Sequence, residues 1–165
     1  MRESRGADRV AVGARVSEGP RLVALDIVGT TIQDRGIVPA ALRASGVRIA
    51  FTTGREREIA EPLLRAASLL NAADALICGG DVETGRPAPF LIFRAMEATG
   101  VTSVHDVACA GDTPLDLQAG FNAGVRWNIG VLSGGQSREQ LAAHPHTHIL
   151  ESAALLQTSW SAGAP

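Results

Sequence analysis

Asp26 is the first residue whose type and setting could support chemistry. The run at 22–31, LVALDIVGTT, carries an apolar strand directly into this aspartate, and a Gly-Thr-Thr turn follows three residues later. A carboxylate at the carboxyl end of a buried parallel strand lies at the edge of the sheet where ligands bind. Among free backbone N–H groups it can attack or coordinate a phosphoryl group. Because Asp-x-x-Gly-Thr is a common pattern by itself, this prediction depends on partners further along the chain.

Three later segments place polar residues at the ends of predicted strands or in loops. They read TTG at 52–54, GRPAP at 85–89 and GDTPLD at 111–116. Together with Asp26 they supply an aspartate, threonines, an arginine and a pair of aspartates, in that order. Such a set offers a nucleophile, a hydroxyl donor, a cation and carboxylates for a metal ion.

The elements that must position these residues alternate along the chain. Strands are expected at 22–26, 47–52, 75–78, 107–110 and 125–129, with a short one at 148–150. Helices are expected at 57–70, 89–99, 114–123 and 137–144. Near-continuous apolar strands alternating with helices predict an α/β fold with a mainly parallel sheet covered on both faces.

The four segments together resemble the four motifs of the haloacid dehalogenase-like (HAD) superfamily of phosphohydrolases. Their sequences are DIVGTT, TTG, GRPAP and GDTPLDL, and they are most similar to the motifs of its phosphonatase-like branch. The resemblance covers roughly residues 21–150. It implies a three-layer, Rossmann-like core in which the first strand lies between the second and the fourth.

The resemblance also implies a role for each site residue. Asp26 would attack phosphorus and form an aspartyl-phosphate. Thr53 and the Gly54 amide would bind the phosphate, and Arg86 would screen its repulsion from Asp26. Thr52 stands next to Thr53, so the sequence leaves open which hydroxyl faces the site. Ordinary roles stay open too: a turn cap, a strand residue or a solvated loop arginine.

Mg²⁺ is the cofactor that the resemblance implies. Its ligands would be the Asp26 carboxylate, the Val28 carbonyl and Asp112, while Asp116 would hold a metal-bound water from one helical turn away. An aspartate at a helix start also favours capping, and the two roles are compatible.

Three departures from the family pattern limit this function. HAD phosphatases usually carry an acid two residues after the nucleophile, where this chain has Val28; such a group is typically worth a factor of roughly 10² to 10⁴ in rate. Phosphonoacetaldehyde hydrolases instead use a lysine that forms a Schiff base, and all 15 basic residues of this chain are arginines. The stretch at 32–45 is too short for the cap domain of capped relatives, so we expect a capless core or a minimal cap with a loop and one short helix.

The leading hypothesis is therefore a Mg²⁺-dependent phosphohydrolase that is slow on unactivated esters. One alternative is a catalytically impaired or non-catalytic relative that binds Mg²⁺ and phosphate, or a partner protein. A response-regulator-like receiver is a weaker alternative, since receivers place a lysine near the site and this chain has no lysine. The expected partner is a small phosphorylated or phosphonate substrate whose identity the sequence does not reveal. A neighbouring subunit could cover the site in a homo-oligomer.

Composition bounds the remaining possibilities. The chain has 165 residues, a net charge of −2 and 45% hydrophobic residues, which favours one globular domain without a basic face for nucleic acid or membrane. We expect a poorly ordered tail at 1–20, a core at 21–158 and a short tail at 159–165. The first segment lacks the apolar run of a signal peptide, which favours the cytoplasm.

Two further groups of residues could bind metal or form a disulfide. Cys78 and Cys109 lie in apolar runs, and we expect buried, reduced thiols. His144, His146 and His148 alternate on one segment, as in a zinc or nickel site, but a surface loop is the favoured interpretation.

Overall fold

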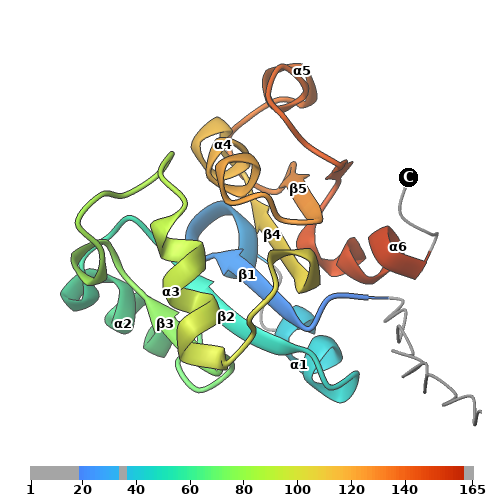
Figure 1. Ribbon diagram of the computed structural model, residues 1–165. Helices are drawn as coiled ribbons and strands as arrows, with labels where there is room; N and C mark the ends of the chain where they lie inside the picture. Colours follow the sequence, from blue (N-terminus) through green and yellow to red (C-terminus); the bar gives the residue numbers. More distant parts are fainter. Residues whose placement is uncertain (1–18, 34–36, 162–165) are drawn as a thin grey trace, which may run out of the picture.

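The computed structural model describes residues 19–33 and 37–161, so residues 1–18 of the tail expected at 1–20 and residues 162–165 of the tail expected at 159–165 lie outside them. The described residues form a six-stranded parallel sheet of order β3-β2-β1-β4-β5-β6 (Figure 1). The strands are β1 (Leu22–Asp26), β2 (Arg48–Thr52), β3 (Ala75–Ile77), β4 (Val107–Gly111), β5 (Trp127–Val131) and β6 (His148–Leu150). β1 lies between β2 and β4, which confirms the α/β fold class and the expected order.

Helices connect the strands in sequence. They are α1 (Ile37–Ala44), α2 (Arg57–Ala66), α3 (Phe90–Thr99), α4 (Pro114–Ala123), α5 (Arg138–Ala142) and α6 (Leu156–Ser161). Short turns of helix occur at η1 (Ile27–Thr31), η2 (Gly79–Asp81), η3 (Val104–Asp106) and η4 (Ala153–Leu155). α3 and α4 are each followed by a glycine in the left-handed conformation, a common helix stop.

The helices depart from expectation at three places. One of them is α5, which is shorter than the helix expected at 137–144. The helix expected at 57–70 ends at Ala66, because Ser68 has a φ of 59° and breaks the helical path. α6 was not expected, and it crosses the expected boundary at residue 158. Ser159 is buried and Trp160 packs edge-to-face on Trp127, so the last described turn of the chain belongs to the core.

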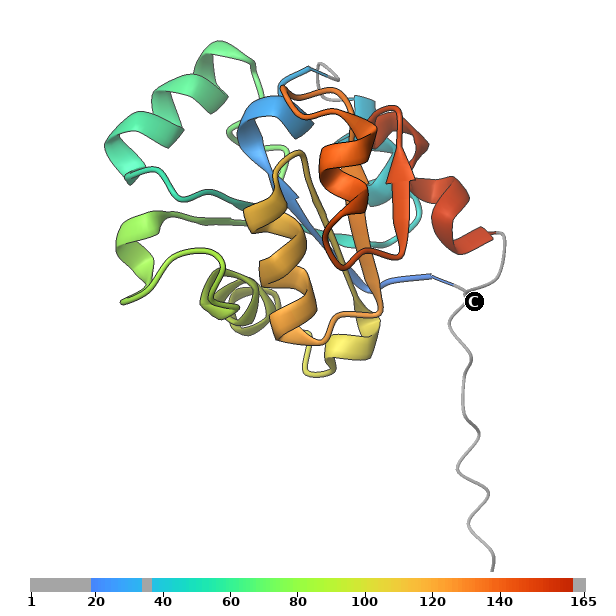
Figure 2. The same ribbon diagram turned by 90° about the horizontal axis from the view of Figure 1, so that it is seen from above.

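The sheet separates two apolar clusters, because successive side chains of a strand point to opposite faces. Val23 and Leu25 of β1 pack in the cluster that holds the buried residues of α1 and α2. Leu22 and Ala24 pack in the cluster that holds those of α3 and α4. Figure 2 shows these helix pairs on opposite sides of the sheet, so the core has three layers.

The described residues that connect β1 to β2 form no cap domain. They include η1 and α1, and Val38 and Leu42 of α1 are buried against the sheet. This agrees with the expected loop and short helix. Among the residues described, no helix has the length and apolar character needed to cross a membrane.

Candidate active site

Asp26 ends β1 at the carboxyl edge of the sheet and is only 8% exposed. The chain then turns sharply through η1, where Gly29 has a φ of 89°. The Thr31 hydroxyl fixes the turn by donating to the Asp26 carbonyl at 2.5 Å. Any larger residue at Gly29 would be strained, and its Cβ would also come within 2.1 Å of the Asp112 carboxylate.

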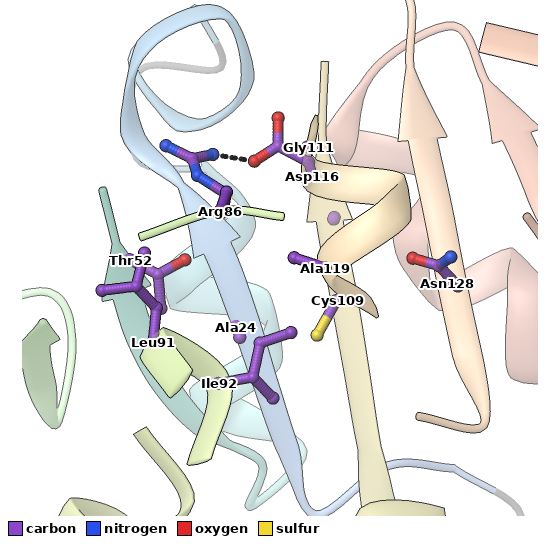
Figure 3. A pocket seen from close by; sticks show the side chains of 11 residues that line it. Ala24, Thr52, Arg86, Leu91, Ile92, Cys109, Gly111, Asp116, Ala119 and Asn128 are labelled. Atoms are coloured by element: carbon purple, nitrogen blue, oxygen red, sulfur yellow. Dashed lines mark ion pairs between the residues drawn. The ribbon is translucent and has the colours of Figure 1, made fainter. Parts of the chain in front are cut away.

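Arg86 joins the first and the last of the predicted motifs. Its Nη1 lies 2.9 Å from Oδ1 of Asp26 and also forms an ion pair with Oδ1 of Asp116. Figure 3 shows the guanidinium directed toward Asp116. The Arg86 side chain is 18% exposed, so this cation is largely withdrawn from water. Three segments far apart in the sequence thus meet at one guanidinium.

Asp116 has the capping role expected for it and also pairs with Arg86, while its role in holding a metal-bound water stays a prediction. One carboxylate oxygen accepts hydrogen bonds from the Thr113 amide at 3.0 Å and the Thr113 hydroxyl at 2.6 Å, which forms a capping box at the start of α4. The other oxygen pairs with Arg86. The cap therefore fixes the orientation in which the carboxylate meets the cation.

Asp112 follows β4 and is 7% exposed. The Thr30 hydroxyl donates to its Oδ1 at 3.2 Å. The segment after β5 also reaches this point: a Cβ at Gly134 would lie 2.0 Å from Oδ2 of Asp112, and the Ser133 hydroxyl donates to the Gly29 carbonyl at 2.7 Å. Sequence reasoning missed Thr30, Ser133 and Gly134, although a Ser-Gly-Gly run after a strand of the same sheet was an available signal.

The two threonines of the second motif both lie beside the site. Thr52 pairs in register with Asp26 and lines a cavity of about 20 Å³ beneath Arg86, large enough for about one water molecule (Figure 3). Thr53 is buried, and its hydroxyl accepts a hydrogen bond from the Arg55 amide at 3.2 Å. A Cβ at Gly54 would lie 3.5 Å from Nη2 of Arg86, so this turn lies close to the guanidinium.

The carboxylates outnumber the cation that they share. Burial raises the pKa of Asp26 above its ordinary value, against the opposing effect of the Arg86 charge and hydrogen bond, and the Asp112 charge raises it further. Burial also raises the pKa of Asp112, although the Thr30 hydrogen bond lowers it. A cation placed between these carboxylates would offset the excess negative charge.

The donor chemistry fits Mg²⁺. Asp26 and Asp112 end neighbouring strands and present hard oxygen ligands, and Mg²⁺ commonly binds one or two carboxylates while keeping several waters. Across the part of the chain that the structure describes, no three His, Cys, Asp or Glu side chains form a group that could hold a metal ion. A bound ion would therefore take its other ligands from backbone carbonyls and water.

The structure also describes the histidines and cysteines that the sequence singled out. His144, His146 and His148 do not form a metal-binding group; Nδ1 of His146 contacts the His144 carbonyl instead. Cys78 and Cys109 are buried free thiols, as expected, and burial raises the pKa of Cys109 to about 12.

Fold and site together define a three-layer α/β core with a cluster of charged groups at the carboxyl edge of its parallel sheet. The family model for haloacid dehalogenase-like hydrolases matches residues 38–129. The chain therefore belongs to the haloacid dehalogenase-like hydrolase family. The matched segment includes Thr53, Arg86, Asp112 and Asp116, whereas Asp26 precedes it.

Relatives of known name point to one branch of this family. A phosphonoacetaldehyde hydrolase from Paraburkholderia phytofirmans is 37% identical over 101 residues, which is 61% of this chain and 38% of the relative. One from Syntrophobacter fumaroxidans is 34% identical over 137 residues, or 78% of this chain and 49% of the relative. The chain thus spans less than half the length of these relatives.

Solved structures support the fold. A haloacid dehalogenase-like hydrolase from Bacteroides fragilis superposes with a TM-score of 0.72 at 16% identity, over 83% of this chain and 99% of the other. A phosphonoacetaldehyde hydrolase-like protein from Oleispira antarctica gives a TM-score of 0.70 at 22% identity, over 82% of this chain and 56% of the other.

Proposed function

We propose that this protein is a Mg²⁺-dependent phosphohydrolase of the phosphonatase-like type that forms an aspartyl-phosphate on Asp26. The observation that carries the proposal is the Arg86 guanidinium, held 2.9 Å from Asp26 and paired with Asp116 at the carboxyl edge of the sheet. A fixed cation beside a buried carboxylate is what an attacking group needs when its target is itself an anion.

The chain's own residues account for the first step. Arg86 contacts Oδ1 of Asp26, which leaves Oδ2 to attack phosphorus. The Thr53 hydroxyl and the Gly54 amide hold phosphate oxygens while the new P–O bond forms. The bond from phosphorus to the leaving group breaks, and that group departs with the electron pair. Water then hydrolyses the aspartyl-phosphate and releases phosphate.

Mg²⁺ would be held by Asp26, Asp112 and the Val28 carbonyl, with Asp116 nearby. When bound, it supplies positive charge that offsets repulsion between the carboxylates and the phosphoryl group. Thr30 and Ser133 contact this part of the site through hydrogen bonds to the Asp112 carboxylate and the Gly29 carbonyl.

The substrate class follows from the missing acid. Val28 provides no proton, so a leaving group that is stable without one, as in an acyl or aryl phosphate, should react fastest. Relatives named phosphonoacetaldehyde hydrolases favour a small phosphorus-containing substrate. An imine route has no lysine in these 165 residues to start from. We expect activity in the cytoplasm, with a neighbouring subunit as a source of cover for the open site.

Acid-quench trapping tests the proposal. Protein is mixed with acetyl phosphate or p-nitrophenyl phosphate, with and without Mg²⁺, and the covalent phosphoprotein is measured. Label is expected on the wild type only with Mg²⁺, and none on Asp26→Asn. The matched control is Asp106→Asn, which removes a carboxylate that pairs with Arg21 away from the site and should leave labelling unchanged.

One observation favours a second candidate, a protein that binds Mg²⁺ and phosphate without turnover. The Val28 side chain is 39% exposed just after the proposed nucleophile, where it offers neither an acid nor a base. Mg²⁺-dependent phosphate binding without label or product across a broad phosphate panel would support this candidate and overturn the first.

A further inference from the structure

The segment that follows β5 contacts the site although none of the four motifs contains it. The Ser133 hydroxyl donates to the Gly29 carbonyl at 2.7 Å, a hydrogen bond between residues 104 positions apart. Gly29 lies in the turn that follows Asp26, between Val28 and Thr30. This hydrogen bond therefore ties the turn behind Asp26 to the end of a different strand.

Gly134 makes a second contact, with Asp112. A Cβ at this position would lie 2.0 Å from Oδ2 and 2.5 Å from Cγ of the carboxylate, so only a glycine can come so close. Gly29 leaves equally little room at the same carboxylate, with a Cβ distance of 2.1 Å to Oδ2. Since Thr30 also donates to Oδ1, backbone on two sequence segments confines the Asp112 side chain.

We propose that Ser133 and Gly134 are positioning residues of the active site: they fix the Val28–Gly29 turn and the Asp112 carboxylate relative to each other. The inference rests on the proposed function, in which these two groups share a Mg²⁺ ion. Mg²⁺ demands near-ideal octahedral geometry, and the groups that orient its ligands are typically worth about 10- to 100-fold in affinity.

A positioning role predicts a change in metal selectivity, which a loss of folding stability alone does not. Ca²⁺ accepts longer bonds and irregular geometry, whereas Mg²⁺ does not. Loosening the turn or displacing Asp112 should therefore weaken Mg²⁺ binding more than Ca²⁺ binding. A mutation that only destabilises the fold would leave the ratio of the two affinities unchanged.

Neighbouring residues provide matched controls. Gly134→Ala is compared with Gly135→Ala, because a Cβ at Gly135 would meet no atom within 4 Å. Ser133→Ala is compared with Ser137→Ala, which removes the hydroxyl that caps α5 in the same connection. Ser133→Thr retains a hydroxyl and should restore what Ser133→Ala loses.

The measurement is calorimetric titration of the full chain with Mg²⁺ and with Ca²⁺. We expect Gly134→Ala to weaken Mg²⁺ binding at least about 10-fold and Ser133→Ala about 10-fold, both with a reduced Mg²⁺ preference. Gly135→Ala, Ser137→Ala and Ser133→Thr should stay within about twofold of wild type. If Ser133→Ala matched Ser137→Ala and Gly134→Ala matched Gly135→Ala, the inference would be overturned.

Hydrogen exchange separates this inference from the proposed function. If the wild type bound no Mg²⁺, the metal-dependent function would fail, and exchange at the amides of residues 27–31 would then decide the positioning role. Faster exchange in Ser133→Ala than in Ser137→Ala supports the hydrogen bond to Gly29 as a restraint on the turn. Equal exchange in the two variants overturns it.

Discussion

Two aspartate–arginine clusters lie at opposite edges of the sheet and differ in the balance of their charges. At the carboxyl edge, one guanidinium, that of Arg86, pairs with Asp26 and Asp116, and Asp112 lies beside them. At the amino edge, one carboxylate, that of Asp74, pairs with Arg43 at 3.5 Å and Arg48 at 3.2 Å.

Their pKa values shift in opposite directions as a result. Burial raises the pKa of both aspartates, but at Asp74 the Ile49 amide, at 2.8 Å, and the two arginines outweigh it and lower the net pKa. At Asp26 the shared arginine does not outweigh burial, and the pKa stays raised. In the Asp74 cluster two arginines neutralise one carboxylate, so no further cation is needed. In the site three carboxylates share one arginine, and the excess negative charge favours binding of a cation.

Arg86→Gln should have the largest effect on stability and on phosphoenzyme formation. It leaves largely buried carboxylates without their cation, and removal of one partner from such a pair costs about 3 kcal/mol of unfolding free energy. Phosphoenzyme formation should fall by at least about 10²-fold, since the attack loses its charge screening. Urea unfolding and acid-quench labelling measure the two effects.

Arg57→Gln is the control for that prediction. It removes a half-exposed arginine paired with Asp81 and Glu61, and we expect a smaller stability change with no loss of label. Equal effects of the two variants would contradict the special role of Arg86.

Mg²⁺ should stabilise the protein through the site alone. At about 100 times its dissociation constant, a ligand of the folded state adds about 2.7 kcal/mol to the unfolding free energy. Asp112→Asn should lose most of this gain, whereas Asp74→Asn should keep it. Thermal unfolding with and without Mg²⁺ tests the difference, and an equal shift in both variants would place the ion elsewhere.

Asp26→Asn should stabilise the metal-free protein by about 1 kcal/mol, an amount common when a buried charge that serves function is removed. The substitution relieves repulsion from Asp112, and Arg86 remains paired with Asp116. Asp106→Asn, at an exposed pair, should change stability little. A clear loss of stability in Asp26→Asn would mean that Arg86 already balances the site.

The strands of both clusters could be predicted from sequence because apolar runs that end in polar residues are local signals. Asp26, Thr53 and Asp112 could be placed at one edge of the sheet because parallel strands end there. Arg86 and Asp116 were grouped with them through the motif pattern, and in the structure Arg86 pairs with both Asp26 and Asp116. Thr30 and Ser133 were missed because their hydrogen bonds connect residues 82 and 104 positions apart. Gly134 was missed because its close approach to Asp112 is a contact between two loops, which has no local sequence signal. α6 was also missed, because the short segment LQTSWS is helical where Leu156 and Trp160 pack on the core.

Asp74→Asn should lose about 1 kcal/mol of unfolding free energy at low salt, a modest effect because the side chain is 20% exposed and its arginines are about half exposed. A lowered pKa means that the folded state favours the charged carboxylate, so this stability is present above the ordinary pKa of 3.8 and is lost as the pH falls through the lower folded value. The difference between wild type and Asp74→Asn should therefore be constant near neutral pH and vanish in acid. Urea unfolding across that range measures it, and a difference that stayed the same in acid would show that hydrogen bonding, rather than charge, holds Asp74 in place.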